Sequence, residues 1–232
     1  FAKKFCNLDK HRFDIKQEVI AKSGLFVTKK RYGLKIINDN GIKVNKMMVK
    51  GLDTVRSSFP TAMRDMLSKV LEDILMDVPK EKLDKFIINF KNSMRLMEVD
   101  KIAIPIGVKN IYKYLGKKNG QFSGHKKGAP VHVKAAIAYN DLLKYYNQDK
   151  RYEKISNGSK IKWVYLKNNN LGLDTVAYKG YEDPPEIMKF IKDNIHPNKL
   201  YKQALHKKIM MLYQALGWDE PTDSSKTIER FF

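Results

Sequence analysis

The chain has 232 residues with 45 Lys and Arg against 25 Asp and Glu, which gives a formal net charge of +20, and 43% of it is hydrophobic. The apolar content supports a folded core and excludes a disordered chain, while the cationic surplus favours a polyanionic partner, nucleic acid before an anionic membrane surface. Cys6 is the only cysteine, which excludes an internal disulfide and a cysteine zinc site, and no apolar run approaches the ~20 residues of a membrane span.

Alternating apolar residues predict a small antiparallel meander in the first fifty residues. Asn40-Gly41 is a typical hairpin turn because both residues adopt positive φ readily. The expected elements are a strand over residues 13–19, a turn at 22–24, a second strand over 25–37, a hairpin turn at 38–41 and a third strand over 47–50.

A basic segment lies on the expected second strand, and it consists of Lys29, Lys30, Arg31 and Tyr32. Alternation along a strand places Lys30 and Tyr32 on one face and Lys29 and Arg31 on the other. A cation beside a phenol suits a phosphate or the edge of a nucleic-acid groove. The alternative is a solvated charge run at the end of a strand.

Residues 51–60 mark a change from strands to helices. Ser57 or Ser58 is expected to cap a helix, with Pro60 in its first turn, and Pro79 separates this helix from a second one. The first helix carries core residues at helical spacing, namely Met63, Met66, Leu67, Val70, Leu71, Ile74 and Leu75; the second carries Leu83, Phe86, Ile87, Phe90, Met94 and Met97.

Beyond residue 100 the pattern predicts shorter elements. Pro105 confines a short strand at 102–106 to a sheet edge, and Asn198 and Gly217 are expected to bound the last helix. The other expected elements are a helical turn at 110–115, a loop at 116–128, a helix at 132–146, a strand at 160–166 and a short helix opened by Pro184-Pro185.

The last stretch, residues 218–232, is polar until it ends on Ile228, Phe231 and Phe232. An apolar triplet on a flexible polar tail suits a short peptide that fills an apolar pocket on a partner. The alternative is that the tail folds back on its own domain.

Catalytic motifs are scarce. The five histidines, His11, His125, His132, His196 and His206, lack metal-ligand spacing, and no glycine-rich phosphate loop occurs. Asp14 and Glu18 share one face of the expected first strand, an arrangement that is more often surface charge than part of a metal site. The residues alone therefore predict a basic α+β module that binds nucleic acid.

The order of these segments resembles the carboxy-terminal part of a family B DNA polymerase of the T-even phage type, from the end of the palm through the thumb. The KKRY run after a short strand is the most specific match, and residues 51–60, GLDTVRSSFP, resemble the family's GLETQKSSTP stretch before a long helix. Residues 124–140, residues 200–209 and the aromatic C-terminus match in order and spacing. The resemblance covers nearly the whole chain from about Phe13.

The resemblance implies a fold and its division. The fold would be α+β, a small antiparallel palm-end meander followed by a mainly helical thumb with short strands. Residues 1–56 would be the end of the palm, 57–217 the thumb and 218–232 a flexible tail with a clamp-binding C-terminus.

The resemblance also implies residue roles. Lys30 and Tyr32 would face the minor groove of the primer–template duplex, where the acceptors are nearly sequence-independent. Arg56 stands where the family has lysine, and Glu18 occupies the position of a carboxylate near the catalytic metals, whereas Lys16 stands where some relatives have Asp. The DNA-binding set would be Lys29, Lys30, Arg31, Tyr32, Arg56, Lys127, His132, Lys134 and Lys207; the set that binds a sliding clamp would be Ile228, Phe231 and Phe232.

The metal-binding aspartates of the family lie in upstream motifs that this chain lacks. Because two-metal phosphoryl transfer needs those carboxylates, we expect the chain to bind no cofactor alone and to be inactive without the upstream palm–fingers–exonuclease portion, which holds Mg²⁺ in the complete polymerase. The chain begins at Phe1, so we expect a fragment or a subunit of a split enzyme. The expected location is the cytoplasm of an infected bacterial host, with no membrane partner.

Two alternatives from other classes remain at this point. One is a stand-alone nucleic-acid-binding or clamp-binding protein without catalysis. The other is a basic protein of a membrane surface.

Overall fold

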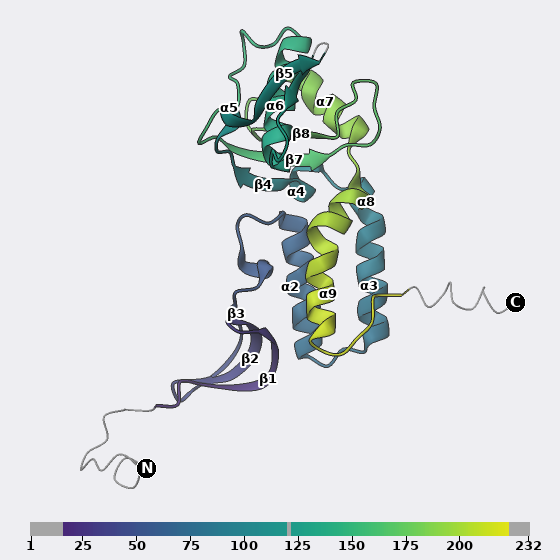
Figure 1. Cartoon of the computed structure of the whole chain (residues 1–232). Coiled ribbons are helices and arrows are strands. Elements are labelled where there is room, and N and C mark those ends of the chain that lie inside the picture. Colours follow the sequence, from purple (N-terminus) through teal and green to yellow (C-terminus); the bar gives the residue numbers. More distant parts are fainter. Residues whose placement is uncertain (1–15, 120–121, 223–232) are drawn as a thin grey trace, which may run out of the picture.

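The computed structural model describes residues 16–119 and 122–222. Three parts follow one another along the molecule in Figure 1: a β-meander, a group of long helices and a mixed α/β part. The expected features at Cys6, His11, residues 13–15 and the apolar triplet Ile228, Phe231 and Phe232 lie outside the described residues. The expected α+β class is confirmed, since the described residues form antiparallel sheets and separate helices.

The meander consists of β1 (Val19–Thr28), β2 (Arg31–Asp39) and β3 (Ile42–Lys50), paired antiparallel in the order β1-β2-β3. Asn40 and Gly41 form the second turn with φ of 50° and 88°, which confirms the predicted hairpin. The Asn38 side chain accepts a hydrogen bond from the Gly41 amide at 2.9 Å and helps to close this turn.

The predicted turn at residues 22–24 is wrong, because β1 runs straight through it. The pairing with β2 shifts register between Ala21 and Ser23, so the strand continues through these residues with a local irregularity. The Ser23 hydroxyl donates to the Leu75 carbonyl at 2.6 Å and so holds the strand to the first long helix. Gly24 lies close to β2, and a Cβ there would lie 2.8 Å from a Leu34 methyl group, which would have to shift.

The first turn lies instead at Lys29 and Lys30, because Thr28 pairs with Arg31. The prediction that the whole basic segment lies on the middle strand is therefore wrong for the two lysines and right for Arg31 and Tyr32. Lys30 has φ of 63°, so the alternation expected for Lys30 and Tyr32 does not extend through this turn.

One face of the meander packs on α2 (Thr61–Leu75). Leu25 is buried there, and a Cβ at Gly33 would lie 3.0 Å from Leu71. All seven apolar residues predicted for the core face of α2 are buried. Before it come η1 (Asp53–Val55) and an extended Pro60 that occupies the N-cap position. The predicted serine cap and the predicted place of Pro60 in the first turn are both wrong, because Pro60 itself is the N-cap and the helix has no side-chain cap.

Two further long helices pack beside α2 (Figure 1). They are α3 (Lys80–Ser93), extended by η2 (Met94–Leu96), and a composite C-terminal helix. The composite helix begins as α8 (Pro197–Leu200), passes through a π-helical segment, η3 (Tyr201–His206), and ends as α9 (Lys207–Gln214). His196 rather than Asn198 is its N-cap, because the His196 ring accepts from the Lys199 amide. Gly217 follows its end with φ of 69°, in keeping with the predicted stop.

The α/β part contains a sheet in the order β4-β7-β8, with α6 packed against β7 and β8. The predicted edge strand, helical turn, helix, strand and proline-opened helix are confirmed as β4, α5, α6, β7 and α7; the buried strand β8 was missed. The bounds are α4 (Val99–Ile102), β4 (Ile104–Gly107), α5 (Ile111–Tyr114), β5 (Leu115–Asn119), β6 (Phe122–His125), α6 (Val131–Tyr145), β7 (Lys160–Tyr165), β8 (Thr175–Tyr178) and α7 (Pro185–Asn194).

The loop predicted at residues 116–128 is wrong, because β5 and β6 pair there as a hairpin. Its glycines permit a close approach of the two strands: a Cβ at Gly124 would lie 2.6 Å from the Lys117 carbonyl oxygen. The buried Asp141 carboxylate of α6 accepts from the Ser123 amide at 2.6 Å and from its hydroxyl at 2.9 Å. A tertiary contact therefore forms these strands where composition indicates a loop.

Candidate nucleic-acid interface

Lys29 and Lys30 form the exposed corner of the first hairpin. Two ammonium groups at the tip of a rigid turn are free to meet phosphates or groove edges, while the paired strands behind them fix the position of their backbone. The positive φ of Lys30 is unusual for a long side chain and marks the turn as held by its surroundings.

Tyr32 lies on the outer face of the meander, away from α2. It stands directly opposite Phe26 in the ladder, and the two ring centroids are 5.6 Å apart. Phe26 is 69% exposed and Tyr32 is partly buried. The corner therefore presents two lysines beside an exposed phenylalanine and a partly buried tyrosine.

Arg31 points the other way, into the protein. Its Nε donates to the Gly51 carbonyl at 3.1 Å, and its Nη2 lies 3.4 Å from Asp53 Oδ2. The sequence analysis expected Arg31 to bind DNA. In the structure its guanidinium contacts a carboxylate of the protein itself, that of Asp53.

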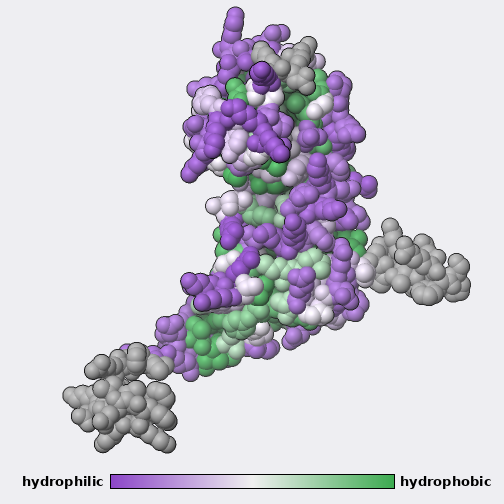
Figure 2. All heavy atoms as spheres, in the orientation of Figure 1, coloured by the Kyte–Doolittle hydropathy of each residue, from purple (hydrophilic) through white to green (hydrophobic). Residues whose placement is uncertain are grey.

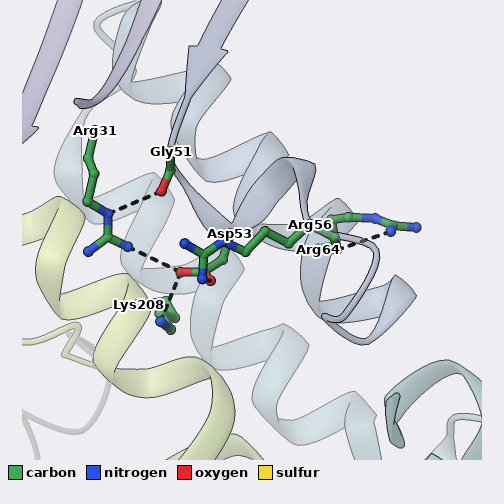
Figure 3. Close-up of polar contacts among 6 residues, drawn as sticks. All are labelled: Arg31, Gly51, Asp53, Arg56, Arg64 and Lys208. Carbon is green, nitrogen blue, oxygen red and sulfur yellow. Dashed lines mark hydrogen bonds and ion pairs between the residues drawn. The ribbon is translucent and has the colours of Figure 1, made fainter. Parts of the chain in front are cut away.

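Asp53 is the centre of a group that we call the Asp53 cluster, made of Asp53, Arg31, Arg56 and Lys208. The carboxylate is 5% exposed. Besides the Arg31 contact, its Oδ2 lies 2.9 Å from Lys208 Nζ and its Oδ1 lies 3.2 Å from Arg56 Nη1. Figure 3 shows the cations converging on it from β2, from the connection to α2 and from α9.

The backbone segments around the Asp53 cluster also approach one another closely. Gly51 has φ of 66°, and a Cβ there would lie 2.3 Å from the Lys30 carbonyl oxygen. Arg64 of α2 donates to the Arg56 carbonyl at 3.4 Å. The connection after β3 is thus tied to the lysine corner on one side and to α2 on the other.

A second group of predicted DNA contacts lies in the α/β part, around the start of α6. Lys127 is exposed in the turn before α6, and His132 and Lys134 are half-buried in the first turns of α6. A helix N-terminus adds amide donors and a positive dipole end that suit phosphate. Burial lowers the pKa of His132 below its usual value, so this side chain is neutral at pH 7 and offers a hydrogen bond without a charge.

His125 and Lys134 also line a cavity of about 360 Å³ between β6, α6 and residues 171–175. Burial, with the nearby Lys134 charge as a smaller cause, lowers the pKa of His125. Asp141 closes the floor of this cavity, but both of its oxygens already accept from Ser123.

The structure therefore divides the predicted site in two. Lys29, Lys30 and Tyr32 lie at the meander, whereas the α6 group lies across the long helices in the α/β part (Figure 1). Lys207, exposed at the first position of α9, lies on the helices between them.

Sequence reasoning missed two residues of the Asp53 cluster. Lys208 is the neighbour of the predicted Lys207, and helical spacing alone could have placed it on a different face. Asp53 lies inside the quoted 51–60 stretch, where it is the one acidic residue, and this was the available signal.

Glu18, the expected carboxylate near the metals, is exposed just before β1. Its carbonyl accepts from the Asn40 amide, which places it at the Asn40-Gly41 end of the meander. The ten-residue β1, at ~3.3 Å per residue, separates it from Lys30 by roughly 30 Å.

The described residues show no cluster of metal ligands. They contain no group of three or more His, Cys, Asp or Glu that could hold an ion, and the buried Asp53 carboxylate is surrounded by cations instead of being open to a metal. In the same part of the chain no helix combines the length and apolarity that crossing a membrane requires.

Comparison with known families decides the assignment. The sequence model of DNA polymerase family B matches residues 2–216. The chain belongs to DNA polymerase family B. A search of curated proteins gave no match.

Membership of DNA polymerase family B confirms the predicted family and implies DNA binding, nucleotidyl transfer and DNA replication. DNA is therefore the polyanion that a family B chain of net charge +20 is expected to bind. The lysine corner and the start of α6 are the two surfaces whose geometry suits it.

Proposed function

We propose that this chain is the palm-end and thumb portion of a family B polymerase of the T-even phage type, and that it grips primer–template duplex behind the active site. The observation that carries the proposal is the lysine corner. Lys29 and Lys30 project from a turn between two paired strands, beside the exposed Phe26 and its ring partner Tyr32.

Lys30 and Tyr32 would reach the minor groove at this corner. The acceptors there are common to all base pairs, so an ammonium and a phenol can sense pair geometry without reading sequence. Lys127, His132 and Lys134 would bind phosphates farther along the duplex from the α/β part, and Lys207 would do so from α9.

The proposal assigns the metal chemistry to a separate upstream palm–fingers–exonuclease portion. The meander supports such a partner, because four large apolar residues of its strands are exposed, namely Ile20, Phe26, Ile37 and Ile42. Figure 2 shows hydrophobic atoms over the part of the molecule where Figure 1 places the meander. Exposed apolar surface of this kind is typical of an interaction site.

The proposal also includes tethering to a sliding clamp through Ile228, Phe231 and Phe232, and action in the cytoplasm of an infected bacterial host. Its support is the resemblance of the C-terminal sequence. Thr222, the last described residue, donates its amide to Asp84 of α3 at 3.3 Å, so the segment beyond it starts from the long helices.

Primer extension tests the division of labour. We expect no extension by this chain alone and extension after it is mixed with the upstream portion, with Mg²⁺ in both reactions. If the two portions never associate while this chain still binds DNA or clamp, the stand-alone binding protein replaces the polymerase subunit.

Lys30→Ala tests the lysine corner. Loss of a charged hydrogen bond is worth ~1.5 kcal/mol, so we expect duplex affinity and primer extension by the mixture to fall about tenfold. Lys43→Ala is the matched control, because it removes the same charge from the opposite end of the same sheet. Equal losses in both variants would contradict a specific role for the corner.

A further inference from the structure

Asp53 joins elements that are far apart in the sequence. Arg31 belongs to the KKRY hairpin, Arg56 follows η1, and Lys208 lies on α9 more than 150 residues later. A single carboxylate, 5% exposed, is the common partner of all three cations.

The charge balance makes this contact depend on the negative charge of Asp53. Three cations face one carboxylate, so removal of the negative charge leaves like charges converging on a shielded site. Removing one partner of a buried ion pair costs far more than an exposed pair contributes. The elements that carry the cations are then expected to separate.

The lysine corner is coupled to the same point through the backbone. Arg31 follows Lys30 directly and binds both Gly51 and Asp53, and the Lys30 carbonyl lies against Gly51. A shift of Arg31 away from Asp53 therefore moves the turn that presents Lys29 and Lys30.

We propose that Asp53 is a positioning residue that locks the lysine corner to α9, so that the palm-end hairpin and the last thumb helix hold the duplex as one rigid unit. This inference rests on the proposed function of the corner as a duplex contact. Asp53 itself touches no DNA in this arrangement, because its oxygens are directed at the three cations.

The test compares Asp53→Asn with Asp84→Asn in the whole chain. Asp84 is an equally buried carboxylate, 4% exposed, and its polar partners among the described residues, Lys80, Tyr213 and the Thr222 amide, lie outside the hairpin. Both variants lose a buried charged acceptor, so Asp84→Asn reports the effect of lowered stability alone.

We expect Asp53→Asn to weaken binding of a primer–template duplex about tenfold and to raise amide hydrogen exchange in residues 28–33 and 206–212 together, with α3 unchanged. Asp84→Asn should leave both the affinity and the exchange of the hairpin near their starting values. A double-mutant cycle between Arg31→Ala and Lys208→Ala should be non-additive in duplex affinity.

Equal affinity losses in the two Asn variants, or unchanged exchange at residues 28–33 in Asp53→Asn, would overturn the proposal. The exchange measurement needs no DNA, so it tests the link between the hairpin and α9 independently of the proposed duplex binding. If the unaltered chain fails to bind duplex, the proposed function falls, while coupled exchange would still establish the link between the hairpin and α9.

Discussion

At the scale of single residues, the lysine corner depends on Gly51, a position where any side chain would be strained and would overlap the Lys30 carbonyl. Gly51 combines a left-handed backbone, φ 66°, with a contact that leaves no space for a side chain. Gly41 has the same kind of backbone, φ 88°, but no atom lies within 4 Å of a Cβ built there. Substitutions at the two glycines therefore distinguish the cost of backbone strain, present at both, from the cost of steric overlap, present at Gly51 alone.

We expect Gly41→Ala to lower the free energy of unfolding by about 1–2 kcal/mol, the cost of a left-handed conformation for a residue with a Cβ. Gly51→Ala should add about 1–3 kcal/mol for overlap with the Lys30 carbonyl, and it should weaken duplex binding as well. Urea unfolding measures the first effect and duplex titration the second. Equal stability in the two variants would mean that the backbone at Gly51 moves freely away from Lys30.

At the scale of elements, a buried acid joins the helices. Asp84 of α3 accepts from the Tyr213 hydroxyl of α9 at 2.9 Å and pairs with Lys80 at 2.6 Å. Burial, and next the hydrogen bond to Asp84, raise the pKa of Tyr213 well above its usual value. The phenol therefore stays protonated as a donor through the whole working pH range.

Tyr213→Phe is expected to lower the free energy of unfolding by about 1.5–3 kcal/mol, because the carboxylate loses a buried donor. Tyr178→Phe is the matched control: Tyr178 is equally buried and donates to Asp100 at 3.2 Å, but Asp100 is exposed and water can replace the phenol. Chemical denaturation measures both, and a control loss as large as the first would contradict this argument.

At the scale of the whole molecule, a net charge of +20 accompanies two surfaces that suit phosphate. Such binding releases counterions, so duplex affinity should fall steeply with salt. A flat response would contradict the phosphate contacts proposed for both surfaces.

The salt slope also distinguishes charged from neutral contacts. Lys127→Gln should reduce the slope of log affinity against log salt by about 0.9, the value for one phosphate contact. His132→Gln should leave the slope unchanged at pH 7, because the lowered pKa keeps the ring neutral there. Titrations of one duplex at several salt concentrations measure both, and a reduced slope for His132→Gln would show that the ring carries charge on DNA.

The sequence by itself determined the core faces of most long helices and the family, although Phe86, predicted for the core of α3, is exposed. Periodic apolar residues identified all seven core positions of α2, and Asn40-Gly41 identified its hairpin, because these signals act within a few residues of each other. The KKRY run likewise marked the lysine corner and led to the correct polymerase family.

Only the tertiary structure decided where the side chains of the basic segment point. Asp141 binds Ser123 in the β5–β6 hairpin, and Arg31 is directed inward, where its guanidinium contacts the Asp53 carboxylate. Lys208 reaches the same carboxylate from a helix that is distant in sequence. Charge and periodicity are local properties, whereas a buried ion pair depends on which distant elements the fold brings together.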